Sequence, residues 1–364
     1  MTAAPARIVL FRALQLGDML CAVPALRALR AAHPRARITL IGLPWAQAFV
    51  ERFPGLIDEL LVFPGAVGFP EQTETNAGLP RFFAEAAARR FDLAIQMHGS
   101  GGIANDILFN LGAHRQAGFV QPGESRPGSF MPWPDSLPEP DRYLALMQAL
   151  GSDAVDRSLW LPLNDDDRAE ASAVLRAHRA ADAAFALIHP GAQLPSRRWP
   201  SARFAAVADA LSDTGLKVLI TGTRGEAALA DALVDAMKRP AFSVAGRTTL
   251  GGMAALVERA RLLVCNDTSV SHIAAAMRTP SVVIASGSDT RRWAPANPTL
   301  HRVLADYPAC RPCAYAQCPY GHECALAISV EQVIDAAHAQ LNPAEPRPAS
   351  IGAARAKELH AAIG

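Results

Sequence analysis

A polar turn at residues 266–271, with the sequence Asn-Asp-Thr-Ser-Val-Ser, has the residue types that bind a diphosphate. It follows the apolar run 262–265, which we expect to be a buried strand, and it precedes a predicted helix. At such a junction the free backbone N–H groups and the helix dipole point at one spot, where they stabilise an anion. The same residue types are also common helix caps. A purely structural capping role therefore stays open for Asp267, Thr268 and Ser269.

Two further loops in the second half of the chain carry groups suited to a nucleotide. After an apolar run at 184–189, Gly191 allows a close approach of the backbone, and Arg197 with the arginine beside it supplies guanidinium groups that suit a phosphate. After a run at 217–221, Glu226 stands at a helix start behind a glycine-bearing turn, an ordinary place to hold a ribose. An arginine pair on a solvated surface loop is the alternative.

A carboxylate in the first half of the chain, Asp18, has the chemistry of a general base. It follows Gly17 after the apolar run 7–11, at the start of a predicted helix, and could take a proton from a nucleophilic hydroxyl. A plain helix N-cap is the alternative. Arg12, directly after the same run, and His98, after the run 93–96, are candidates for binding the acceptor. A structural role is equally open for His98.

Four cysteines gather near the C-terminal end: Cys310, Cys313, Cys318 and Cys324. Four thiolates can hold a structural zinc or iron ion in a tetrahedral site. Their spacing is not that of two well separated C-x-x-C pairs, so reduced thiols packed beneath a loop are the alternative.

The elements that must position these residues alternate between strands and helices. Strands are expected at 7–11, 37–41, 59–63, 93–96, 184–189, 217–221, 262–265 and 281–285. Helices are expected at 19–32, 79–90, 104–111, 201–213, 226–237, 252–259 and 270–277. This alternation is typical of an α/β fold with parallel sheets. We predict two Rossmann-like, doubly wound domains, at 1–160 and 161–342, followed by a linker and a C-terminal helix or tail at 343–364. Ligands of such sheets bind outside the carboxyl ends of the strands, so the polar loops should line a cleft between the domains.

The composition excludes other classes of protein. Of the 364 residues, 50% are hydrophobic, and the net charge is +1, which argues against a protein that binds nucleic acid by neutralising phosphates. Apolar runs long enough to span a bilayer are lacking, and the N-terminus has no signal-peptide pattern. We therefore expect a cytoplasmic protein.

Four segments together resemble glycosyltransferase family nine, the bacterial heptosyltransferases. They are Leu16-Gly-Asp-Met with the following Pro-Ala-Leu-Arg, His189-Pro-Gly-Ala with Arg-Arg-Trp-Pro, Asn266-Asp-Thr-Ser-Val-Ser-His, and the cysteine-rich stretch. The resemblance covers roughly residues 6–340. It implies a GT-B fold and an inverting transfer of heptose from ADP-heptose to the lipopolysaccharide core, with no required cofactor. It also implies a lipid-linked saccharide acceptor and peripheral contact with the inner membrane.

The resemblance also assigns roles to residues. It implies that Asp18 is the base, that Arg197 contacts the donor diphosphate, that Glu226 holds the ribose and that Asp267 contacts the donor sugar. The cradle for the phosphates corresponds to Thr268, Ser269, Ser271 and His272, and Thr248 falls near the adenine site.

Three departures leave the donor sugar and the acceptor open. Ala13-Leu-Gln follows the first strand, where the family often has small hydroxyl residues. Ser269 stands where the family usually has glycine, and Arg197 replaces a lysine. A different nucleotide sugar or a protein acceptor on the same fold is one alternative. A nucleotide-binding module without turnover is another.

Overall fold

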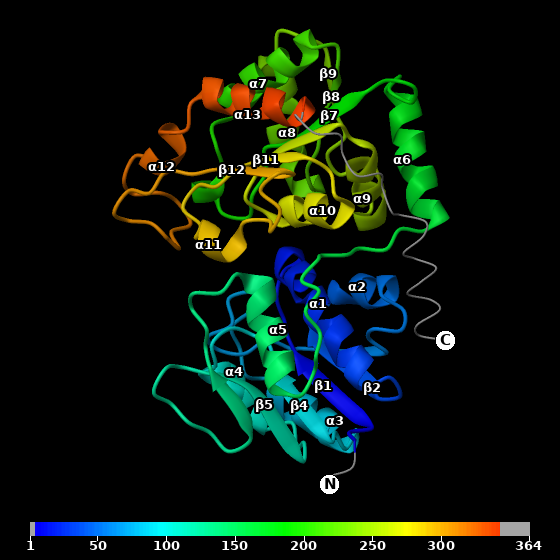
Figure 1. Ribbon diagram of the computed structural model, residues 1–364, viewed down its shortest axis with the longest axis vertical. Helices are drawn as coiled ribbons and strands as arrows, with labels where there is room; N and C mark the ends of the chain where they lie inside the picture. Colours follow the sequence, from blue (N-terminus) through cyan, green and yellow to red (C-terminus); the bar gives the residue numbers. More distant parts are fainter. Residues whose placement is uncertain (1–3, 343–364) are drawn as a thin grey trace. The chain divides into compact units, whose positions relative to one another are not determined.

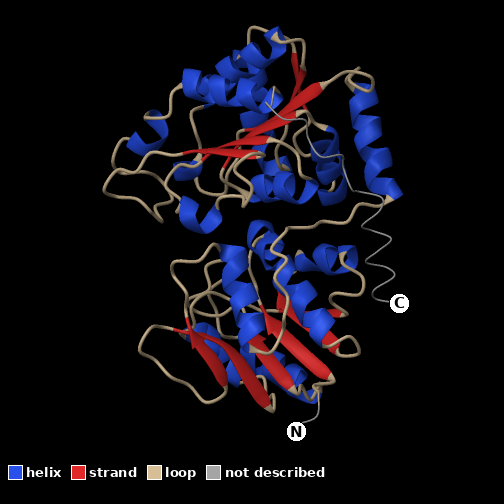
Figure 2. Cartoon of the chain, in the orientation of Figure 1, coloured by secondary structure: helices blue, strands red, loops and turns tan. Residues whose placement is uncertain are grey.

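The computed structural model describes residues 4–342, which form two compact units, one ending at Leu159 and the other beginning at Trp160. Strands and helices alternate in both units, so the predicted α/β class is confirmed (Figures 1 and 2). The helix or tail predicted at 343–364 lies outside the described residues.

The first unit contains a parallel sheet with the strand order β3-β2-β1-β4-β5-β6. Its strands are β1 (Arg7–Phe11), β2 (Arg37–Gly42), β3 (Glu59–Val62), β4 (Leu93–Gln96), β5 (Arg115–Val120) and β6 (Ser129–Pro132). Its helices are α1 (Leu16–Ala32), α2 (Ala46–Arg52), α3 (Leu79–Ala88), α4 (Ile103–Phe109) and α5 (Glu139–Ala149). Because β1 pairs with both β2 and β4, the order of the strands reverses at the β1–β4 pair.

Helices cover both faces of this first sheet, as its apolar strands require. One apolar cluster joins Phe11 and Ala94 of the sheet to Phe82 of α3 and Leu108 of α4. On the sheet itself, β1 is buried from Ile8 onward, and α1 packs against α5. The sheet therefore holds the loops after β1 and β4 on a rigid support.

The second unit repeats this plan with the strand order β12-β11-β10-β7-β8-β9, again all parallel. Its strands are β7 (Phe185–His189), β8 (Lys217–Ile220), β9 (Ala241–Ser243), β10 (Leu262–Asn266), β11 (Ser281–Ile284) and β12 (His301–Leu304). Its order reverses between β7 and β10, which pair directly. Both units thus contain a parallel, doubly wound sheet, as the sequence predicted.

Helices surround the second sheet in the same way. They are α6 (Asp165–Ala177), α7 (Ser201–Asp213), α8 (Ala227–Ala236), α9 (Leu250–Arg259), α10 (Ser269–Met277), α11 (Thr290–Trp293), α12 (Glu323–Leu326) and α13 (Val330–Leu341), with the 3₁₀ turns η1 (Pro195–Arg197) and η2 (Arg224–Glu226). One core joins Phe204 of α7 and Val333 of α13 to the sheet residues Ile188 and Val264. The start of the first of these helices, α6, is stabilised by a capping box between Asn164 and Asp167.

Several elements were not predicted from the sequence. They are the strands β5, β6, β9 and β12 and the helices α2, α5, α11, α12 and α13. Of these strands, β6 is a half-exposed edge strand. Edge strands carry weak periodicity because one side faces solvent. The start of α5 did carry a signal, since Pro140 occupies one of its first positions, where proline is favoured.

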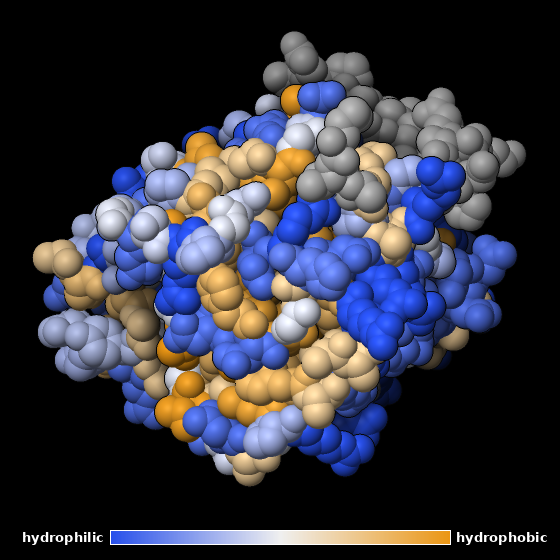
Figure 3. All heavy atoms as spheres, turned by 90° about the horizontal axis from the view of Figure 1, so that it is seen from below, coloured by the Kyte–Doolittle hydropathy of each residue, from blue (hydrophilic) through white to orange (hydrophobic). Residues whose placement is uncertain are grey.

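The face drawn in Figure 3 carries polar and apolar residues side by side. Among residues 4–342, no helix combines the length and the apolar character that crossing a membrane requires.

Candidate functional site

In the second unit, the loops after β7 and β10 meet where the strand order reverses. Asn266, the last residue of β10, is completely buried and joins the two loops. Its Oδ1 accepts a hydrogen bond from the backbone N–H of Trp199 at 2.9 Å, and its Nδ2 donates to the carbonyl of Pro190 at 2.8 Å. The segment that carries Gly191 and Arg197 is therefore fixed beside Asp267.

The helix α10 begins shortly after Asn266, whose two hydrogen bonds to Trp199 and Pro190 form a clamp between the loops after β7 and β10. Thr268 is its N-cap residue, yet the Thr268 side chain makes no capping hydrogen bond to the described helix. The hydroxyl of Ser271 donates to the Thr268 carbonyl at 2.7 Å, while Asp267 accepts from the hydroxyl of Ser288, after β11. Asp267, Thr268 and Ser269 are half-buried. The Thr268 side chain therefore does not cap the helix. The first turn of α10 has backbone N–H groups that lack partners within the helix.

Arginine side chains lie beside this helix start. Arg197 donates to the carbonyl oxygens of Ser286 and Cys313, and Arg311 donates to the carbonyl of Ser288 at 2.7 Å. Burial above all lowers the pKa of Arg311, and the charge of Arg197 lowers it further, so the two cations are near neighbours. Nη2 of Arg311 and Oγ of Ser286 are buried polar atoms for which the described residues provide no hydrogen-bond partner. An anion at this place would meet two guanidinium groups.

The metal site predicted from the cysteines is not found. Within residues 4–342, no group of three or more His, Cys, Asp or Glu side chains is arranged to hold a metal ion. Cys310, Cys313 and Cys318 are half-buried and Cys324 is buried, all as free thiols. Burial raises the pKa of Cys324 above its ordinary value. The backbone N–H of Cys313 instead donates to Gly287, so this loop supports the residues around Arg197.

Glu226 lies in the turn η2 after β8, close to Gly191. Its Oε2 accepts from the backbone N–H and the hydroxyl of Thr223, at 2.8 and 2.9 Å. A Cβ atom on Gly191 would lie only 2.1 Å from Oε1 of Glu226. A side chain at position 191 would therefore displace the Glu226 carboxylate. The loops after β7 and β8 therefore meet at these two residues.

Two other predicted residues, Thr248 and His272, also belong to the second unit. Thr248 is half-buried in the turn between β9 and α9. His272 is buried in the first turns of α10, and its ring lies 6.3 Å from that of Trp293.

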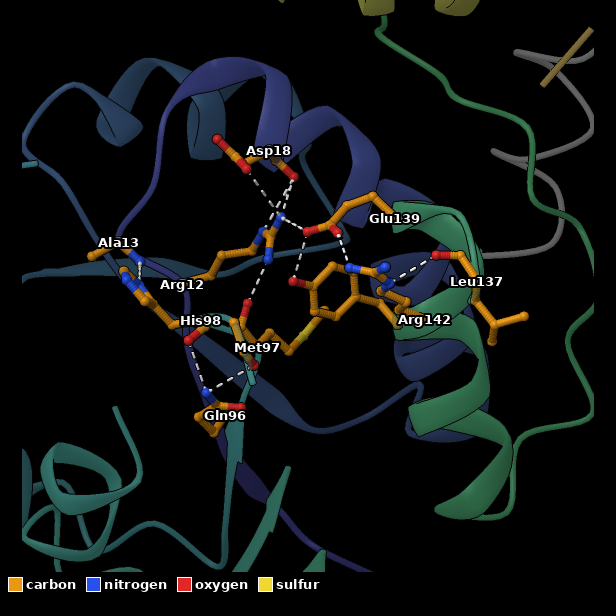
Figure 4. Close-up of polar contacts among 11 residues, drawn as sticks. Arg12, Ala13, Asp18, Gln96, Met97, His98, Leu137, Glu139 and Arg142 are labelled. Atoms are coloured by element: carbon orange, nitrogen blue, oxygen red, sulfur yellow. Dashed lines mark hydrogen bonds and ion pairs between the residues drawn. The ribbon is translucent and has the colours of Figure 1, made fainter. Parts of the chain in front are cut away.

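In the first unit, the loops after β1 and β4 meet where that strand order reverses (Figure 4). Arg12 donates to the backbone carbonyl of Met97, and Nδ1 of His98 accepts from the backbone N–H of Ala13 at 3.2 Å. The ring of His98 stacks on Phe11 at 5.1 Å. Burial, with the charge of Arg12, lowers the pKa of His98 to about 3, so its ring is neutral at neutral pH.

Asp18 lies in the first turn of α1 rather than at its cap, because the helix begins at Leu16 with Gln15 as N-cap. Nε and Nη2 of Arg12 donate to the backbone carbonyl of Asp18, at 3.2 and 2.7 Å. Nη2 also lies 4.0 Å from the carboxylate Oδ1. The Asp18 side chain is 25% exposed, whereas that of Arg12 is 1% exposed. Asp18 thus presents a solvent-accessible carboxylate that is held from behind by a buried cation.

The structure also shows contacts that the sequence analysis missed. They involve Asn266, Ser288 and Arg311 in the second unit and Glu139 in the first. Asn266 stood inside the recognised motif, and its place at the end of a buried strand was a usable signal. Glu139 and Arg311 carried none, because their contacts join segments far apart in the sequence.

Comparisons with known proteins agree on one family. The model of glycosyltransferase family 9 (heptosyltransferase) matches residues 79–323. Lipopolysaccharide heptosyltransferase 2 of Escherichia coli K12 is 25% identical over 289 residues, which are 74% of this chain and 79% of that protein.

Solved structures show the same fold. A family 9 glycosyltransferase from Veillonella parvula superimposes with a TM-score of 0.75 at 24% identity, over 92% of this chain and 97% of that one. The ADP-heptose lipopolysaccharide heptosyltransferase II of E. coli gives 0.71 at 18% identity, over 92% and 98%.

Proposed function

Because this chain belongs to glycosyltransferase family 9, the heptosyltransferases, we propose that it transfers heptose from ADP-heptose to a saccharide of the lipopolysaccharide core. That the protein is a glycosyltransferase follows from the family. The donor and acceptor are proposals that rest on the names of its relatives. The observation that carries the chemistry is the half-exposed carboxylate of Asp18, fixed at the carboxyl end of β1.

The second unit, residues 161–342, is proposed to bind the donor. The start of α10, with Thr268, Ser269, Ser271 and His272, would face the diphosphate, and Arg197 would neutralise it. Support comes from the buried Arg311 and Ser286 atoms that have no partner among the described residues. Glu226 would accept hydrogen bonds from the ribose, Asp267 would contact the sugar, and Thr248 would lie toward the adenine.

The first unit, residues 1–160, is proposed to bind the acceptor. Asp18 would remove the proton of an acceptor hydroxyl while its oxygen attacks the anomeric carbon and the diphosphate leaves, which inverts that carbon. His98 stays a candidate for acceptor contact. The buried Arg12 is better placed to hold Asp18 than to touch a substrate.

The transfer that we propose uses no cofactor, because the guanidinium groups and the helix start stabilise the leaving diphosphate. We propose a lipid-linked acceptor reached by peripheral contact with the cytoplasmic face of the inner membrane.

Two variants separate the proposed roles in the donor site. We expect Arg197→Ala to weaken ADP and ADP-heptose alike, by roughly tenfold to a hundredfold, because each loses a charge-assisted hydrogen bond. Asp267→Ala should weaken the binding of ADP-heptose much more than that of ADP, because the proposed contact of Asp267 is with the heptose, which ADP lacks. Titration calorimetry with both ligands measures this. Arg198→Ala is the control, because Nε of Arg198 donates to the carbonyl of Ala192 and this arginine has no proposed role in donor binding. Equal losses of both ligands in the Asp267 variant would contradict the assignment.

A third variant tests the contact between Gly191 and Glu226. We expect Gly191→Ala to displace the Glu226 carboxylate and to weaken ADP binding by about tenfold, the loss of roughly one hydrogen bond to the ribose. Gly225→Ala is the matched control, because a Cβ there would have only an ordinary contact, 3.9 Å from the Thr223 hydroxyl. Calorimetry with ADP and with ribose 5-phosphate, which has no adenine, shows whether the lost affinity belongs to the ribose. Equal affinity of both variants for ADP would count against a role for Glu226.

A further inference from the structure

A buried group of charged side chains lies behind Asp18 in the first unit (Figure 4). At its centre is Glu139, whose side chain is fully buried. Its Oε1 accepts a hydrogen bond from the Tyr143 hydroxyl at 2.9 Å and lies 3.5 Å from Nη2 of Arg12. Its Oε2 lies 3.4 Å from Nη1 of Arg142. The Glu139 carboxylate is therefore a shared anion for two buried cations.

The position of Glu139 is fixed by the start of α5. Glu139 is the first residue of that helix, where the helix dipole favours a negative charge. Arg142, one turn later, donates to the carbonyl oxygens of Leu137 and Asp135 at 2.8 and 2.7 Å. These bonds tie α5 to the loop before it, and α5 packs against α1, which carries Asp18. The carboxylate thus has little freedom to move.

Arg12 connects this anion to Asp18. The same nitrogen, Nη2, donates to the Asp18 carbonyl at 2.7 Å and faces both carboxylates. Burial alone would lower the pKa of Arg12, but Tyr143, Glu139 and Asp18 together raise it above its ordinary value, so the guanidinium stays charged. Its plane also lies over the Tyr143 ring, 4.3 Å from the centroid.

We propose that Glu139 is a positioning residue for the glycosyl transfer: it holds the Arg12 guanidinium against the first turn of α1 and balances its charge, so that Asp18 keeps both its place and its basicity. This inference rests on the proposed function of Asp18 as the base.

The balance of charges around Asp18 explains why Glu139 is needed. The groups that face this site are Arg12 from the loop after β1, His98 from the end of β4, and Glu139, Arg142 and Tyr143 from α5. His98 is neutral above a pH of about 3. Without the Glu139 charge, the Arg12 cation 4.0 Å from Asp18 would act on that carboxylate alone. It would then stabilise the ionised form and make Asp18 a weaker base.

The test is the titration of Asp18 itself, followed by the carboxyl ¹³C signal in the full-length protein labelled at aspartate. The signal is assigned by its loss in Asp18→Asn. In Glu139→Gln, we expect the Asp18 midpoint to fall by about one pH unit, as for a carboxylate beside an uncompensated cation. We also expect kcat, measured as ADP release from ADP-heptose with a heptose-deficient core acceptor, to fall by roughly tenfold while KM for the donor is unchanged.

Two further variants separate this role from simple stability. Glu139→Asp keeps the charge and should restore the Asp18 midpoint and part of kcat. Tyr143→Phe removes one hydrogen bond to Glu139 and should lower the melting temperature without moving that midpoint. An unchanged midpoint in Glu139→Gln would overturn the inference. If the Gln variant does not fold, an Asp18 midpoint that falls by about one pH unit in Glu139→Asp would overturn it, because that variant keeps the charge. Near-normal turnover of Asp18→Asn would instead overturn the proposed base, whatever the Glu139 variants show.

Discussion

Replacing Asp18 by asparagine should reduce glycosyl transfer by roughly 10²–10⁴, the contribution of a positioned general base. The substitution keeps the size of the side chain and leaves the Asp18 backbone carbonyl available to Arg12. The first turn of α1 should therefore stay in place, and only the ability to accept the proton is lost. The measurement is the rate of ADP release from ADP-heptose in the presence of a core acceptor.

Two further observations make this result specific. The affinity for ADP, measured by calorimetry, should be nearly unchanged in Asp18→Asn, because the residues that we propose to bind the donor belong to the second unit. Asp106→Asn is the matched control, since Asp106 is also an acid in the first turn of a helix of the first unit, paired with Arg126 at 2.9 Å. Equal turnover of the Asp18 and Asp106 variants would mean that another group is the base.

The fold was largely predictable from local patterns. The runs 8–11 and 262–265 are continuous apolar segments, and the structure buries both in the middle of parallel sheets. Turns that follow such strands must lie at the carboxyl edge of the sheet, so the loops with Asp18, Arg197 and Asp267 could be placed from their order alone. Strands such as β6, at a half-exposed sheet edge, lack that continuous pattern and were missed.

The contacts within each site were harder to predict, because they join residues that are distant in sequence. Arg12 meets Glu139 only because α5 packs against α1, and nothing in the segment 121–140 indicates this pairing. The sequence made Arg12 a candidate for binding the acceptor. Because Arg12 is buried, we propose instead that it supports Asp18. The spacing of the cysteines likewise placed them in one segment, in which Cys324 belongs to α12, but it did not show whether their sulfur atoms converge.

Both the stability of the second unit and its proposed affinity for the donor should depend strongly on Asn266. The sequence placed this residue in a motif but did not assign it a function. In Asn266→Leu, a side chain of similar size removes both the acceptor for the Trp199 N–H and the donor to the Pro190 carbonyl. Both backbone groups lie in the buried interior and would lose their partner. Since each unsatisfied buried group costs about 1–3 kcal/mol, we expect the free energy of unfolding to fall by roughly 3 kcal/mol or more.

The same change should weaken ADP binding by about tenfold or more, because the loop of Arg197 is no longer tied beside Asp267. Asn105→Leu is the matched control: Asn105 is also completely buried and its Nδ2 donates to the Phe119 carbonyl at 2.9 Å, but it belongs to the first unit. That variant should lose stability and keep its affinity for ADP. Urea unfolding and calorimetry measure the two quantities. If Asn266→Leu binds ADP as tightly as Asn105→Leu does, the clamp between β7 and β10 stabilises the second unit without shaping its nucleotide site.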